Sequence, residues 1–265
     1  MEKRFRFTAA LCLLCCIAGT VCACGTASDS LKTVRLKGDR KTLTVPLEYA
    51  ADTGLALSVD LQFTDGGANP ITVLPVSAEE SPYAVITYPE DFEDYGFSAV
   101  LDGGVLRLDT GRGCRYTTEA FSMTLYAEVV SYELIGALEL TADSGEIPME
   151  TLRLDITGGA AVEMHGIAAD AVVLDVEGAA DVVLAGETGV LDAEINGAGA
   201  LEATLLAARN AAVVINGIGI ADIACAEALD AEINGAGCIA YVGEPTVTKE
   251  INGAGTVSKI PEQTS

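Results

Sequence analysis

The chain has 265 residues, and its 39 acidic side chains outnumber 15 basic ones to give a formal net charge of −24. So negative a surface excludes nucleic acid and anionic lipid as partners held through charge. Five of the eight cysteines fall in the first 24 residues, which leaves an odd three, Cys114, Cys225 and Cys238. We therefore expect no disulfide framework.

Residues 1–23 are typical of a lipoprotein signal peptide. Basic residues at positions 3, 4 and 6 precede an apolar stretch over 7–21, which is too short for a comfortable membrane span. The following V-C-A-C resembles a lipobox and predicts lipid attachment at Cys24. An ordinary secretory signal cleaved near residue 23 or 27 is the alternative. The lipid reading places the chain on the extracytoplasmic face of a bacterial cell membrane, contacting the membrane only through its anchor.

A short tether over 24–32 is followed by an irregular β-rich half over 33–148. Its strand-like runs are 55–63, 83–88, 105–108, 121–130 and 132–140, interrupted by D-G-G at Asp65 and Asp102. These runs are either the first coils of a solenoid or a cap over its open end. The acidic, aromatic segment 88–97 (YPEDFEDYGF) is either a ligand patch or a surface turn packed by its own rings.

Residues 149–260 contain six copies of one short phrase. Their first residues, called anchors below, are Ile156, Val176, Ile195, Ile215, Ile233 and Ile251, spaced by 20, 19, 20, 18 and 18 residues. A period near 19 that tolerates such slips indicates a solenoid of stacked coils. Residues 261–265 are a short tail that begins with Pro.

Each copy has glycine two residues after its anchor, and four copies have asparagine just before that glycine. The residue six after the anchor is always apolar, as in a strand with one buried face. A recurrent glycine requires positive φ or leaves no room for a Cβ, and asparagine suits the same corner. Helical repeats are excluded because of the glycine content, so we predict a parallel β-helix with 18–20 residues per coil. The predicted turn residues are Gly158, Gly178, Asn196, Gly197, Asn216, Gly217, Asn234, Gly235, Asn252 and Gly253.

An acidic residue precedes five of the six anchors. These residues are Asp155, Asp175, Glu194, Glu232 and Glu250, and Val214 interrupts them. Stacked in register, they form either a ladder for Ca²⁺ or a cationic partner, or a solvated face that opposes aggregation. No cofactor other than Ca²⁺ is suggested. The asparagines either form a hydrogen-bonded ladder or read a ligand.

The N-G-A-G units and the stretch INGAGCIAYVGEPTVTKEINGAGTVSKI resemble the head GIN domain family, which is named for auto-transporter adhesins. The likeness is most specific from Leu191 to Ile260. It implies a right-handed β-helix on a bacterial surface or envelope protein, and the family supplies no catalytic residue.

We therefore predict a non-enzymatic, adhesin-like surface lipoprotein that binds a glycan or an envelope protein. A structural or self-assembling envelope element is the alternative, and a polysaccharide-cleaving enzyme is the third reading. The only histidine, His165, has no nucleophile in a recognisable motif, and the negative field opposes anionic sugar substrates. The ligand and the oligomeric state are left open.

Overall fold

The computed structural model describes residues 32–49, 54–64, 69–76, 80–111, 114–118 and 120–261, so the predicted anchor Cys24 and the signal peptide lie outside the described residues. The fold is all-β, as predicted, with one short 3₁₀ helix among the described residues. The elements are β1 (Lys32–Arg35), β2 (Arg40–Pro46), β3 (Leu55–Asp60), β4 (Pro70–Leu74), β5 (Tyr83–Pro89), η1 (Glu90–Tyr95), β6 (Ser98–Asp102), β7 (Val105–Asp109), β8 (Cys114–Thr117), β9 (Ser122–Tyr126), β10 (Val129–Asp143), β11 (Pro148–Ile233), β12 (Ala236–Val242), β13 (Thr246–Ile251) and β14 (Thr256–Lys259).

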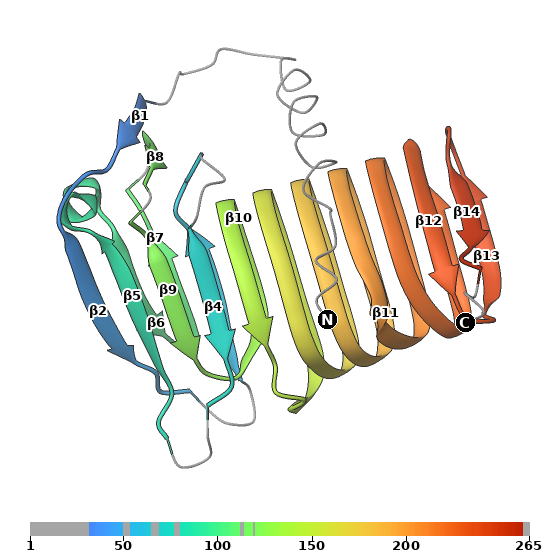
Figure 1. Ribbon diagram of the computed structural model, residues 1–265, viewed down its shortest axis with the longest axis horizontal. Coiled ribbons are helices and arrows are strands. Elements are labelled where there is room, and N and C mark those ends of the chain that lie inside the picture. The colour runs from blue at the N-terminus through green and yellow to red at the C-terminus, as the bar shows by residue number, and fades with distance from the viewer. Residues whose placement is uncertain are drawn as a thin grey trace, which may run out of the picture. The chain divides into compact units, whose positions relative to one another are not determined.

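Most strands belong to one large mixed sheet that does not close on itself. Its main path runs β14-β12-β11-β10-β4-β9-β5-β2, and β1 and β8 form a separate parallel pair. All the antiparallel pairs, β2 with β5, β5 with β9 and β6 with β7, lie in the N-terminal half (Figure 1). From β10 to β14 every pairing is parallel. The N-terminal half thus contains both parallel and antiparallel strand pairs.

The order of the rungs in the N-terminal half differs from their order in the sequence. Strands β3 and β4 pair in parallel with β10 on one side and with β7 and β9 on the other. Strands β3 and β4 therefore lie between β10 on one side and β7 and β9 on the other, although they come first in the chain. The sheet then continues from β10 into β11, because residues 131–143 of β10 pair in parallel with residues 153–165 of β11.

The 86-residue β11 ribbon winds through successive rungs in Figure 1. The anchor column forms a fully buried line of the core, because Ile156, Val176, Ile195, Ile215 and Ile233 are each at most 1% exposed. Full burial of each such side chain contributes roughly 1.5–3 kcal/mol. The register adds a seventh unit that the sequence analysis missed, because Leu134 pairs with Ile156 and Gly136 with Gly158.

The recurrent glycines are required by the close approach of neighbouring coils. A Cβ on Gly197 would lie closer than 3.0 Å to the carbonyl oxygen of Gly178, and the backbone there has a φ of 142°. The same conflict with the preceding glycine recurs at Gly158, Gly178, Gly217, Gly235 and Gly253. The physical basis of the glycine column is therefore mainly the absent Cβ, and Gly158, Gly178, Gly197 and Gly217 lie within the continuous ribbon of β11.

The cysteines and the apolar segments complete the description. Cys114, Cys225 and Cys238 are free thiols, and Cys225 is buried in the core. In the part of the chain that the structure describes, no helix combines the length and apolarity that crossing a bilayer requires.

Gly197→Ala should lower the free energy of unfolding by about 3 kcal/mol, because it combines backbone strain with overpacking against Gly178. Gly103→Ala is the matched control, since Gly103 also has positive φ (56°) but a Cβ there would meet nothing within 4 Å. It should cost only about 1 kcal/mol. Urea unfolding followed by circular dichroism measures both. Equal losses of unfolding free energy in the two variants would show that the positive φ, and not the close approach of neighbouring coils, requires glycine at position 197.

Candidate functional site

The four asparagines of the repeat form a continuous hydrogen-bonded ladder. The side-chain amide of Asn216 donates to Asn196 Oδ1 at 2.9 Å, and Asn234 donates to Asn216 Oδ1 at 2.9 Å. Asn252 donates in turn to Asn234 Oδ1 at 3.0 Å. All three bonds between asparagines run the same way along the stack, so Asn216 and Asn234 each donate to the preceding coil and accept from the next. This arrangement matches the structural reading of the asparagine column.

The acidic column is joined to this ladder. Glu194 Oε1 accepts hydrogen bonds of 3.0 Å from both Asn196 and Asn216. Glu232 accepts from Asn234 at 2.6 Å, and Glu250 accepts from Asn252 at 3.0 Å. At Val214, where the carboxylate is missing, Asn216 bonds to the carboxylate of the preceding coil instead. The amides thus offset the repulsion between stacked carboxylates.

The first two acidic positions have different surroundings. Asp155 Oδ2 accepts from Arg153 Nε at 2.7 Å, whereas Asp175 forms no hydrogen bond or ion pair with any described residue. Partial burial raises the pKa of the Asp175 carboxyl above its ordinary value of 3.8, and the negative charges of Glu194 and Asp155 raise it further. The ionised form of Asp175 therefore destabilises the folded chain.

Four of the five carboxylates of the acidic column accept hydrogen bonds from neighbouring side chains. Among the residues that the structure describes, no group of three or more His, Cys, Asp or Glu side chains is arranged to hold a metal ion. Three of the five predicted carboxylates, at Glu194, Glu232 and Glu250, are engaged by asparagine amides. The column gains a further member at Glu133, which pairs with Asp155 and accepts from the Ser58 hydroxyl at 2.6 Å.

The aromatic segment 88–97 packs inward. Phe92 is fully buried, and its ring stacks on Phe97 with centroids 4.9 Å apart and on Phe63 at 5.8 Å. Tyr88 is 7% exposed, and Tyr95 packs against the same core. The rings therefore fix η1 against the N-terminal strands, and the surface-turn reading of this segment is the one that the structure supports.

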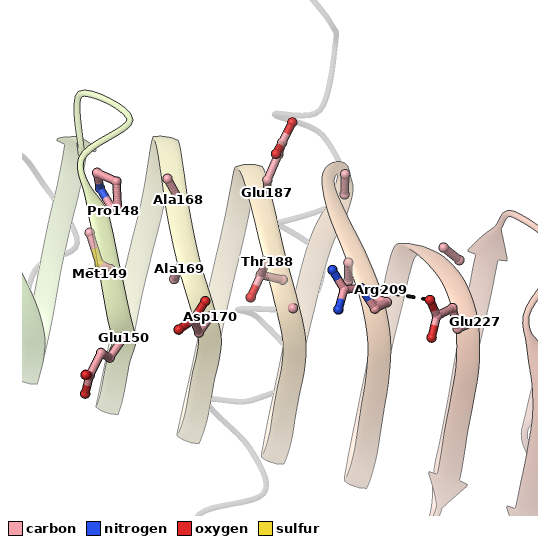
Figure 2. A pocket seen from close by; sticks show the side chains of 14 residues that line it. Pro148, Met149, Glu150, Ala168, Ala169, Asp170, Glu187, Thr188, Arg209 and Glu227 are labelled. Atoms are coloured by element: carbon pink, nitrogen blue, oxygen red, sulfur yellow. Dashed lines mark ion pairs between the residues drawn. The ribbon is translucent and has the colours of Figure 1, made fainter.

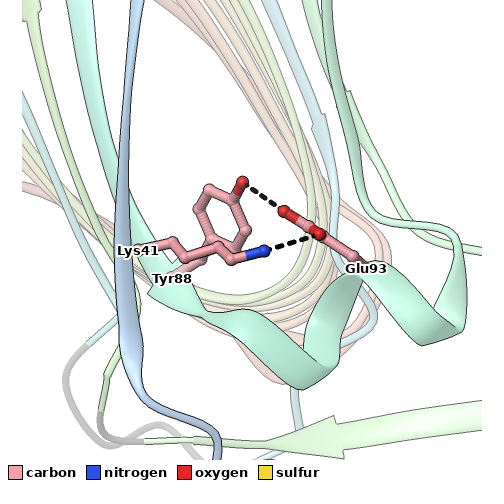
Figure 3. Close-up of polar contacts among 3 residues, drawn as sticks. All are labelled: Lys41, Tyr88 and Glu93. Carbon is pink, nitrogen blue, oxygen red and sulfur yellow. Dashed lines mark hydrogen bonds and ion pairs between the residues drawn. The ribbon is translucent and has the colours of Figure 1, made fainter.

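Figure 3 shows the polar contacts that close this end of the sheet. Glu93 accepts from Lys41 Nζ at 2.8 Å and from the Tyr88 hydroxyl at 2.9 Å. The hydrogen bond from Lys41 lowers the pKa of Glu93, and the Tyr88 bond lowers it further. These contacts tie β2 to η1.

A groove that the sequence analysis missed runs across the coils of β11. It encloses about 840 Å³ and draws its walls from five successive coils (Figure 2). Its floor consists of small or short side chains, among them Ala169, Thr188, Gly189 and Ala208. A Cβ on Gly189 would lie 2.6 Å from the carbonyl oxygen of Asp170, so the floor cannot be raised there without moving the strand.

Charged side chains border this groove. Six residues before successive anchors stand Glu150, Asp170, Gly189, Arg209 and Glu227. Arg209 Nε lies 3.9 Å from Glu227 Oε1, and Arg209 is the only Lys or Arg between residues 154 and 248. Glu187 projects at the upper margin in Figure 2. This column, read six residues before each anchor, is the sequence signal that could have revealed the groove.

The remaining predicted residue, His165, lies outside the groove. Its Nε2 atom is 2.8 Å from Glu163 Oε1, and both side chains are about half exposed. Within the groove, the only hydroxyl, at Thr188, donates to the carbonyl oxygen of Val190 at 2.9 Å. Neither place pairs a nucleophile with a base.

The fold and these columns define an all-β repeat protein whose coils stack through glycine and asparagine. The chain belongs to the family described as "Putative auto-transporter adhesin, head GIN domain", whose model matches residues 69–245. Among curated proteins, none matches the chain.

Solved structures share the fold. A putative adhesin from Bacteroides fragilis NCTC 9343 superposes with a TM-score of 0.71 at 17% identity, over 86% of this chain and 100% of that one. A putative lipid binding protein from Parabacteroides distasonis ATCC 8503 gives 0.61 at 18%, over 87% and 100%. A putative adhesin from Parabacteroides merdae ATCC 43184 gives 0.58 at 19%, with the same coverage. Identities this low establish a common fold alone.

Asp175→Asn should stabilise the chain at pH 7 by about 0.5 kcal/mol, the size of a screened surface interaction. Because the folded-state pKa of Asp175 is raised, its penalty is absent below the unfolded value and grows as the pH rises through the folded value. The gain should therefore vanish at pH 3. Thermal unfolding at both pH values, with the exposed Asp192→Asn as control, measures this. An equal gain at pH 3 would contradict the electrostatic origin.

Proposed function

We propose that this chain is a non-enzymatic binding module of the bacterial cell envelope, with an adhesin-like role. Family membership supports a surface protein, and the predicted lipid at Cys24 would hold it on the extracytoplasmic face of the membrane. We further propose that residues 149–260 form a right-handed parallel β-helix, following the irregular half over 33–148. The parallel pairing of every rung from β10 to β14 supports this description.

The groove across β11 is the observation that carries the binding role. It is built on continuous hydrogen-bonded rungs, so its walls are fixed before any ligand arrives, which reduces the entropic cost of binding. The asparagine ladder runs through three of the five coils that line the groove, those of Asn196, Asn216 and Asn234, and holds their spacing. Since the asparagines and four of the five carboxylates near the anchors are already hydrogen-bonded within the chain, the groove is the better candidate for contact with another molecule.

The alternative reading, end-to-end self-assembly, is opposed by a charge at the C-terminal coil. Lys249 pairs with Ala231, which is fully buried, and so belongs to a core-facing column. At β13, which pairs only with β11 among the described strands, Lys249 is exposed. An inward-pointing charge on an edge strand prevents another strand from adding there. Ile251 on the same strand is 37% exposed, against 0% for Ile233 below it.

Lys249→Leu should convert the C-terminal edge into an apolar face and cause concentration-dependent self-association at micromolar concentrations, whereas the unaltered chain stays monomeric. Sedimentation velocity checks both. Thr248→Leu is the matched control, because Thr248 pairs with the exposed Asp230 and faces outward. A multimer of the unaltered chain would instead favour the structural reading.

The binding role is tested by screening glycans, peptidoglycan fragments and peptides against the full chain by surface-immobilised binding, with calcium and with chelator. We expect saturable binding without release of a cleaved product, unaffected by the chelator. Product formation would contradict the non-enzymatic proposal. Absence of saturable binding to every class would contradict the binding role itself.

A further inference from the structure

We propose that the groove across β11 takes an extended, cationic peptide segment of a partner protein. This inference rests on the proposed binding function and adds the class of ligand to it. It is carried by the shape of the groove together with a set of carboxylates that have no hydrogen-bond or ion-pair partner among the described residues.

The dimensions of the groove suit an extended peptide. Glu150 and Glu227 lie four coils apart, and coils at the spacing of paired strands give a span of about 19 Å. An extended chain of about six residues covers that length. The floor along Ala169, Thr188 and Ala208 is nearly closed to solvent and carries only short side chains, so a main chain can approach it closely.

The charges of the groove select a cationic ligand. Glu150, Asp170 and Glu187 are exposed, and none of the three has a hydrogen bond or ion pair to any residue that the structure describes. Other carboxylates of these coils, such as Glu194 and Asp155, are hydrogen-bonded. In Figure 2, Glu187 occupies one margin, and Glu150 and Asp170 lie towards the other. Side chains that alternate along an extended peptide reach both margins.

Arg209 sets one end of the arrangement. Its guanidinium pairs with Glu227 at 3.9 Å, which neutralises the fourth carboxylate and leaves the free negative charge over the first three coils. A basic segment is therefore expected to place its charges over Glu150, Asp170 and Glu187. The groove contains no aromatic side chain, which sets it apart from the aromatic-rich pockets that bind most small molecules.

The test uses the full chain and a fluorescein-labelled peptide of alternating lysine and alanine, with the glutamine–alanine peptide as a neutral probe. Fluorescence anisotropy should show saturable binding of the lysine peptide alone, weakening as salt is added. The triple variant Glu150→Gln/Asp170→Asn/Glu187→Gln should weaken binding about ten-fold, because three screened charge pairs are removed.

A matched triple variant separates the groove from the overall negative charge. Glu139→Gln/Asp192→Asn/Glu202→Gln removes the same residue types from exposed positions outside the groove and should change affinity less than two-fold. Arg209→Gln should strengthen binding two- to three-fold, since it removes a like charge and releases Glu227. A gain in affinity cannot result from misfolding.

The outcomes separate this inference from the proposed function. Equal losses in the two triple variants would show binding through the diffuse field and overturn the inference. Saturable binding of a glycan without binding of the lysine peptide would overturn it and leave the binding function standing. Failure of every ligand would overturn both.

Discussion

Everything in the coiled part of this chain depends on how closely one backbone passes over the next at the recurrent glycine. The carbonyl oxygen of each glycine occupies the place that a Cβ of the next would need. That contact fixes the register of the coils, and the register stacks the anchor residues into the buried core line. Because a shift by one residue would turn every core side chain outward, the glycines specify the fold as well as permitting it.

The same register creates an electrostatic cost that the chain resolves locally. Stacking the anchors also stacks the acidic residues that precede them, at positions such as Asp175 and Glu194. Asparagine amides two residues further along donate hydrogen bonds to three of these carboxylates. The register that buries the anchors therefore also brings these acidic side chains within reach of hydrogen-bond donors. Asp175 has no such amide beside it, and partial burial together with the charges of Glu194 and Asp155 raises the pKa of its carboxyl.

The sequence predicted the regular half well because its constraints are local and repeated. Gly, Asn and the apolar residues recur at fixed distances from each anchor, so their roles could be argued without coordinates. The unit at Gly136 escaped notice because its spacing to the next is wider and isoleucine replaces asparagine before the glycine. The interleaving of β3 and β4 between β10 on one side and β7 and β9 on the other is a long-range choice that no local pattern records.

The groove was missed for a related reason. Ala169, Thr188 and Ala208 are ordinary residues that carry no motif, and the column beside them reads Glu, Asp, Gly, Arg and Glu, so no single residue type marks it. A groove lined by small side chains leaves little trace in the composition of the sequence. By contrast, the inward packing of Phe92 and its neighbours could be anticipated, since aromatic rings without a partner seek the core.

The asparagine ladder also determines how this protein ages. An asparagine followed by glycine loses its amide readily, because glycine offers no side chain to hinder attack by its backbone nitrogen. Inside the stack, Asn216 has both its amide and its oxygen engaged by neighbouring rungs. Asn252 is exposed on the last rung, and its side-chain oxygen accepts no hydrogen bond from any described residue. Chemical damage should therefore start at the C-terminal coil and convert the ladder, rung by rung, into adjoining carboxylates.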